Sequence, residues 1–150
     1  MYGALTPIHS LLRWVVLILL LTAIIKSLSG LMSKRAYAPS DNKISLFLMI
    51  SAHTQLLVGL LLYFVSPLVQ FNGEALKTPE VRFFTMEHSV MMIIAIALIT
   101  IGRISSKKAA TDESKFRKSF IFFLIALLII FMSIPWPFHM PGIPAMRSWF

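Results

Sequence analysis

Hydrophobic residues along this chain gather into four long runs separated by short polar segments. The runs cover residues 8–31, 44–66, 83–101 and 116–134. Each is close to the ~20 residues with which an α-helix crosses ~30 Å of hydrocarbon. A membrane β-barrel would instead alternate apolar and polar residues over segments of about ten, whereas these runs are apolar on every face. The pattern therefore predicts four membrane-spanning helices.

The segments between these runs are short, and short loops place successive helices side by side and antiparallel. The predicted fold class is all-α, an integral membrane four-helix bundle with up-down-up-down topology. Composition agrees, because 57% of the residues are hydrophobic and 13% are charged. The spans use most of the 150 residues, so residues 1–150 are expected to form one transmembrane domain without a separate soluble catalytic domain.

The net charge of +8 would suggest nucleic acid as a partner for a soluble chain, but here its distribution among the loops indicates orientation. The first and third loops are rich in Lys and Arg, and the second is not. By the positive-inside rule, the first and third loops are cytoplasmic. We therefore expect a multi-pass protein of the cell inner membrane with both termini on the periplasmic side. Lys34 and Arg35 follow the first apolar run instead of preceding it, so that run is expected to remain in the mature protein.

Four histidines are the main candidates for chemistry: His9, His53, His88 and His139. An ionisable residue at membrane depth costs a few kcal/mol unless it faces the bundle interior or a partner. Counted from the outer ends of the spans at about 1.5 Å per residue, His9 lies roughly 2–5 Å deep, His88 roughly 8–9 Å and His53 roughly 18–20 Å. His139 follows the fourth span. The chain has no cysteine, which excludes disulfides and covalent c-type haem attachment.

Histidines from different helices at similar depth are what a b-type haem needs, because each face of the iron accepts one imidazole. His9 and His88 come closest to a common level, on helices expected to be diagonal in the bundle. Arg13, one turn below His9, and Arg82 are candidates to pair with a haem propionate. Glu87 is a candidate to accept a hydrogen bond from the N–H of a ligating imidazole, and its expected contacts are Arg13, His9 or Arg82.

His53 leaves several readings open. One alternative is a pair with His88, which requires that the second helix is displaced or tilted. The others are that His53 belongs to a second ligand set, or that it makes a polar contact with Thr54 or Gln55 of a neighbouring copy. The alternative for all these residues is structural. His9 then faces the headgroups, and Arg82, Glu87 and His88 form a polar cluster that joins helices without a cofactor.

Four sequence strings resemble a known group of proteins. "HSLLRW", "ISAHTQLLVGL", "VRFFTMEH" and "SIPWPF" are similar to small four-helix membrane proteins of Bacteroidota labelled cytochrome b or b561-like, over nearly the whole stretch 9–138. The resemblance favours a ligand pair drawn from the first three histidines; His139 falls outside it. The chain lacks the evenly spaced two-plus-two histidines expected of a two-haem cytochrome b561, which leaves one haem b or none. The resemblance covers the following residues: His9, Arg13, His53, Arg82, Glu87, His88, Pro135, Trp136 and Pro137.

The leading hypothesis is a small b-type cytochrome with one non-covalent haem near the periplasmic side. It would carry electrons between a quinone pool and a partner on the outer side, as an electron-transfer protein and not an enzyme with its own substrate chemistry. The main alternative is a cofactor-free accessory subunit that binds other membrane subunits. A third reading is a proton relay through Glu87, His88 and His53, but the inner halves of the third and fourth spans are expected to lack an ionisable residue to continue it.

Overall fold

The computed structural model describes residues 1–136, so Pro137 and His139 lie outside the described residues. Within this range the elements are all helical, and they follow in the order α1 (Tyr2–Ser33), α2 (Pro39–Val65), η1 (Ala75–Lys77), α3 (Pro79–Arg82), η2 (Phe83–Glu87), α4 (His88–Lys108) and α5 (Asp112–Ser133). The element η2 is a π-helical turn that joins α3 to α4, so the three form one continuous helix.

Four helices of the described part are long and apolar enough to cross a membrane: Tyr2–Ser33, Pro39–Val65, Pro79–Lys108 and Asp112–Ser133. The chain is therefore an all-α, multi-pass membrane protein. The predicted spans were right in number and order. Their ends differ by up to seven residues, because hydropathy marks only the apolar centre of a helix, whereas its backbone hydrogen bonds continue into the polar interface.

The largest difference concerns Arg103, which the sequence analysis placed in the third loop. The helix continues to Lys108, and Arg103 lies within α4 with only 7% of its surface exposed. The expectation that the inner half of the third span lacks an ionisable residue was therefore wrong. In the sequence the apolar run ends at Ile101, so Arg103, two residues later, was assigned to the loop.

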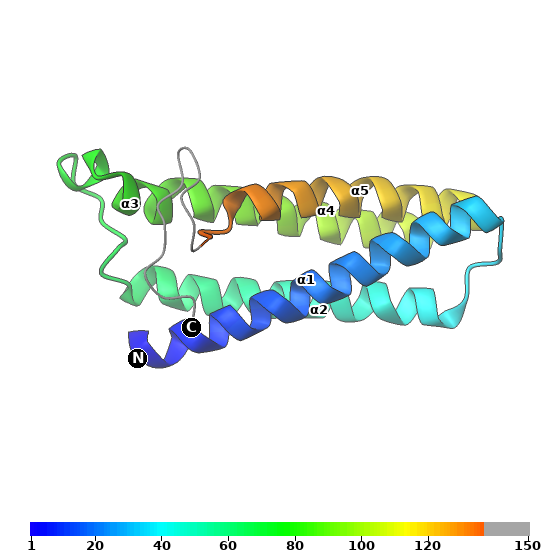
Figure 1. Ribbon diagram of the computed structural model, residues 1–150, viewed down its shortest axis with the longest axis horizontal. Coiled ribbons are helices and arrows are strands. Elements are labelled where there is room, and N and C mark those ends of the chain that lie inside the picture. Colours follow the sequence, from blue (N-terminus) through cyan, green and yellow to red (C-terminus); the bar gives the residue numbers. More distant parts are fainter. Residues whose placement is uncertain (137–150) are drawn as a thin grey trace.

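The helices pack in the order expected for an up-down-up-down bundle (Figure 1). The helix α1 packs against α2 and α5, and α4 packs against the same two helices, so α1 and α4 are diagonal. Figure 1 shows α1 running obliquely relative to the other three long helices. Its N-terminal end lies at the same end of the bundle as the C-terminal end of α2 and the short helix α3.

The interior of the bundle is apolar along its centre. Leu20, Leu48, Ile99 and Phe123 come from four different helices, and each is at most 1% exposed. Large apolar side chains also cover the outside, as a bilayer requires. On α1 they recur every seven residues, at Leu11, Ile18, Ile25 and Met32.

A glycine allows close helix packing at the end of α1. A Cβ added to Gly30 would lie 2.5 Å from Cζ of Phe116, whose ring is 1% exposed. The ring of Phe116 on α5 therefore occupies the space that any larger residue at position 30 would need. Arg35 lies over the same ring, with its Cζ 4.7 Å from the centroid.

Replacing Gly30 by alanine is expected to destabilise the bundle by about 1–3 kcal/mol, because the buried ring must move to admit the methyl group. Unfolding with increasing SDS in mixed micelles measures this change. The matched control is Gly3→Ala, since a Cβ at Gly3 meets no atom within 4 Å among the described residues. Equal stability of the two variants would contradict the packing described here.

Candidate functional site

The π-helical turn η2 determines how His88 is presented. A π-turn holds one more residue than an α-turn, and such insertions often occur at functional sites. Residues four and five positions before His88 then both lie beside it. The ring centroids of Phe83 and Phe84 are 5.8 and 6.1 Å from that of His88. The segment Phe83–Glu87 carries no proline or glycine, so its sequence did not predict a π-helical turn.

Contacts from outside the helix hold the π-turn in place. The hydroxyl of Tyr63 on α2 donates to the carbonyl oxygen of Thr85 at 2.9 Å. The backbone N–H of Gln70 donates to the Thr85 hydroxyl at 3.1 Å, and Thr85 is 5% exposed. Because buried backbone groups require partners, these bonds stabilise an otherwise irregular turn.

His88 is oriented by the fourth span. Its Nδ1 lies 2.9 Å from the carbonyl oxygen of Ser133, near the end of α5. A carbonyl oxygen only accepts, so Nδ1 carries the proton and donates. In the neutral ring Nε2 then keeps its lone pair and is the nitrogen available to a metal.

His9 enters the site from the diagonal helix α1 and lies against α2. The side-chain Nε2 of Gln55 donates to the carbonyl oxygen of His9 at 3.0 Å. One turn further along α2, a Cβ added to Gly59 would lie 3.2 Å from His9 Cε1. The absence of a side chain at Gly59 therefore makes room for the imidazole.

The two imidazoles meet between the helices. Their ring centroids are 6.5 Å apart, with an angle of 69° between the ring planes. Their similar depth and the expected diagonal position of their helices had made them the leading pair in the sequence. The structure brings the two side chains together.

His53 lies elsewhere. It is exposed, and its Nε2 is 2.9 Å from Oγ1 of Thr100 on α4. Thr100 follows His88 by twelve residues, which is roughly 18 Å along a helix at 1.5 Å per residue. The structure therefore does not bring His53 to the level of His88, and its polar partner is within the same chain.

Glu87 meets one of its three expected partners. The Nε of Arg82 donates to Glu87 Oε1 at 2.9 Å, and both side chains are nearly half exposed. Arg13 is half-buried, and its Cζ lies 5.5 Å from the ring centroid of Trp14. Assignment of Arg13 or Arg82 to a haem propionate stays a prediction.

Several residues of this site could not be assigned to it from the sequence, among them Gln55, Gly59, Tyr63 and Ser133. Gln55 was noted only as a contact for a neighbouring copy. The sequence did offer one signal. Gln55 and Gly59 are four residues apart and so lie on the same face of α2, and a polar residue beside a glycine leaves room there for a side chain from another helix. Ser133 acts through its backbone carbonyl, which no residue type reveals.

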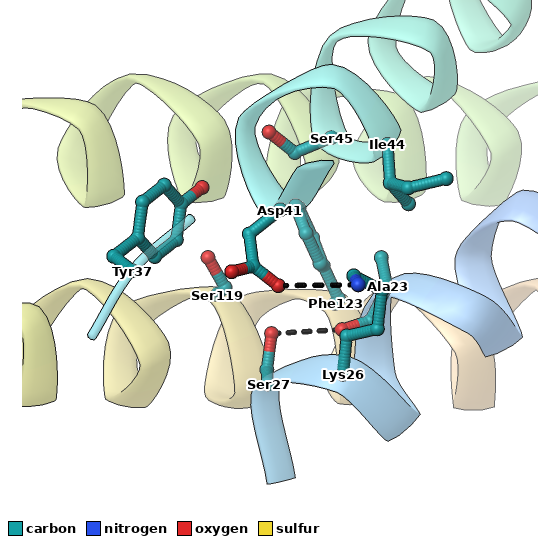
Figure 2. Close-up of a pocket in the computed structure, with 9 residues that line it drawn as sticks. All are labelled: Ala23, Lys26, Ser27, Tyr37, Asp41, Ile44, Ser45, Ser119 and Phe123. Atoms are coloured by element: carbon teal, nitrogen blue, oxygen red, sulfur yellow. Dashed lines mark hydrogen bonds and ion pairs between the residues drawn. The ribbon is translucent and has the colours of Figure 1, made fainter. Parts of the chain in front are cut away.

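A second polar cluster, the Asp41 network, lies at the other end of the bundle and comprises Lys26, Arg35 and Asp41. Both terminal nitrogens of Arg35 donate to the Asp41 carboxylate, at 2.7 and 2.8 Å. This hydrogen bonding raises the pKa of Arg35 above its usual value. Lys26 Nζ is 3.6 Å from the same carboxylate. Lys26 and Asp41 line a cavity of about 10 Å³, and Figure 2 shows their side chains facing each other there.

Arg103 joins helices at this same end. Its Nη1 donates to Ser45 Oγ at 2.5 Å and to the backbone and side-chain oxygens of Asn42 at 3.1 and 3.2 Å. These bonds tie α4 to α2. Lys26 follows His9 by seventeen residues, or roughly 25 Å along α1, so the Asp41 network is separate from the histidine pair.

The fold and the paired imidazoles define a multi-pass helical membrane protein whose polar site lies between two diagonal helices. No family model matches the chain, and comparisons with curated proteins and with solved structures find no match.

Proposed function

We propose that the protein is a small b-type cytochrome that binds one non-covalent haem between His9 and His88. The observation that carries the proposal is the 6.5 Å separation of the two imidazole centroids across the bundle. A metal–imidazole bond is about 2 Å long, so an iron bound by two imidazoles on opposite faces holds their ring centres roughly 6 Å apart. The donor set fits this ligation.

The surroundings of His88 support the same assignment. Metal-binding histidines usually donate their other ring N–H to a carbonyl or carboxylate, which sets the ring orientation. The bond from His88 Nδ1 to the Ser133 carbonyl is of this kind. Phe83 and Phe84 place aromatic rings beside the imidazole.

Haem b at this position would supply one-electron redox chemistry, with a quinol-class donor and a protein acceptor as partners. The chain's own residues would bind and orient the haem through the two imidazoles. Arg13, one turn from His9, and Arg82 are the proposed partners of the propionates. By the positive-inside rule, the basic end near the Asp41 network faces the cytoplasm, so the proposed haem lies toward the periplasmic side of the inner membrane.

Absorbance spectroscopy tests the proposal directly. Protein purified from cells supplied with a haem precursor is expected to give a reduced-minus-oxidised spectrum of six-coordinate haem b, at about one haem per chain. His53→Ala is the matched control, because it removes another histidine of a membrane span and should leave the spectrum unchanged. Protein that stays colourless after titration with haemin would refute the proposal.

The second candidate is a cofactor-free subunit of a larger membrane assembly. It is favoured by the T-shaped contact of the two imidazoles, since aromatic rings at 6.5 Å and 69° also form an ordinary packing contact. Colourless protein that co-purifies with defined membrane subunits at fixed stoichiometry would support this candidate over the cytochrome.

A further inference from the structure

Two buried polar atoms at the α1–α2 contact have no hydrogen-bond partner among residues 1–136: Nδ1 of His9 and Oε1 of Gln55. Buried polar groups are nearly always paired, so each such atom calls for an explanation. One is a ring nitrogen that can carry a proton, and the other only accepts. They are complementary.

The two atoms belong to residues that are already hydrogen-bonded to each other. Gln55 Nε2 donates to the backbone carbonyl of His9 at 3.0 Å, which anchors the amide beside this residue. Gly59, four residues after Gln55, lies on the same face of α2, and a Cβ there would be 3.8 Å from His9 Nδ1. The Nδ1 edge of the imidazole thus faces the helix that carries Gln55.

A glutamine side chain has the freedom to complete this contact. Its last torsion angle is broad, without sharply separated rotamers, so the amide turns at little cost. A rotation that brings Oε1 to His9 Nδ1 satisfies both atoms at once.

We infer that Gln55 is a positioning residue for His9, which accepts a hydrogen bond from Nδ1–H and thereby keeps the lone pair on Nε2. Ser133 does the same for His88 with a backbone carbonyl. Both imidazoles then present Nε2 as the free nitrogen. The role of the free Nε2 atoms in haem ligation rests on the proposed function. The effect of Gln55 on the tautomer of His9 does not depend on haem.

The first test uses the protein without haem. Nitrogen-15 NMR of histidine-labelled protein in detergent is expected to show His9 as the Nδ1–H tautomer in the wild type. Gln55→Leu is expected to abolish that preference, and Gln55→Glu, which keeps an acceptor, to retain it. Thr54→Ala is the matched control, because the Thr54 hydroxyl bonds only to Ile50 of its own helix among the described contacts. An unchanged His53 signal verifies folding.

The second test uses the haem-loaded protein. Loss of an outer hydrogen bond to a metal ligand typically lowers affinity 10–100-fold, so Gln55→Leu should raise the haem dissociation constant by about that factor. Gln55→Glu should restore affinity and lower the reduction potential, since a carboxylate makes the ligand more basic. A His9 tautomer that is the same in wild type and Gln55→Leu would overturn the inference.

The two tests separate this inference from the proposed function. If the wild type binds no haem but its His9 tautomer depends on Gln55, the cytochrome is refuted and the positioning role stands. If haem binds and the tautomer ignores Gln55, the cytochrome stands and the positioning role is refuted.

Discussion

Replacing His88 by alanine is expected to abolish haem binding, with the affinity for haemin falling more than about 100-fold. Loss of outer contacts to a metal ligand costs 10–100-fold, and removal of the ligand itself should cost more. The substitution also leaves the Ser133 carbonyl without its donor. Titration of the purified protein with haemin, followed by absorbance, measures the change.

Three further variants make this result specific. His9→Ala should reproduce the loss, because both imidazoles are proposed to bind one iron. His53→Ala should bind haem like the wild type, since His53 is exposed and contacts Thr100. His88→Met should keep a six-coordinate haem with a raised reduction potential, as methionine in place of histidine does. Full haem binding by His88→Ala would rule out the proposed ligand pair.

Replacing Asp41 by alanine is expected to produce the largest loss of stability, about 3 kcal/mol. The Asp41 side chain is 4% exposed, and it accepts from Arg35 and from the backbone N–H of Ala38 at 2.8 Å. Removing one partner of a buried ion pair costs roughly 3–5 kcal/mol, because the remaining charge stays unpaired. The low end applies here, since Arg35 is about one-third exposed and can turn toward water.

The free energy of unfolding in mixed micelles checks this value. Asp41→Asn removes the charge but keeps the shape of the side chain. This variant should lose the stabilisation from the ion pair with Arg35, while its side-chain oxygen still accepts from the N–H of Ala38. Glu113→Gln is the control, because the pair of Glu113 with Arg117 is largely exposed and should contribute less than about 0.5 kcal/mol. An Asp41→Ala variant as stable as Glu113→Gln would contradict the role of the Asp41 network.

The number of spans, their order and their antiparallel arrangement followed from the sequence because hydropathy and loop length are local properties. In a bilayer every backbone polar group must be paired within the helix, so a long apolar run has few alternatives. Depth along a helix is also local, since each residue adds about 1.5 Å. Depth, together with the expected diagonal position of the helices, made His9 and His88 the leading pair, while a pair with His53 stayed open.

Only the tertiary structure decided which way these side chains point and what surrounds them. The π-turn at Phe83–Glu87 rotates His88 toward its neighbours, and its stabilising bonds come from Tyr63 and Gln70, which are distant in sequence. The burial of Arg103 and the exposure of His53 were likewise decided by helix rotation. Rotation depends on how whole helices pack against one another, and the apolar runs of this chain, hydrophobic on all sides, carry little information about it.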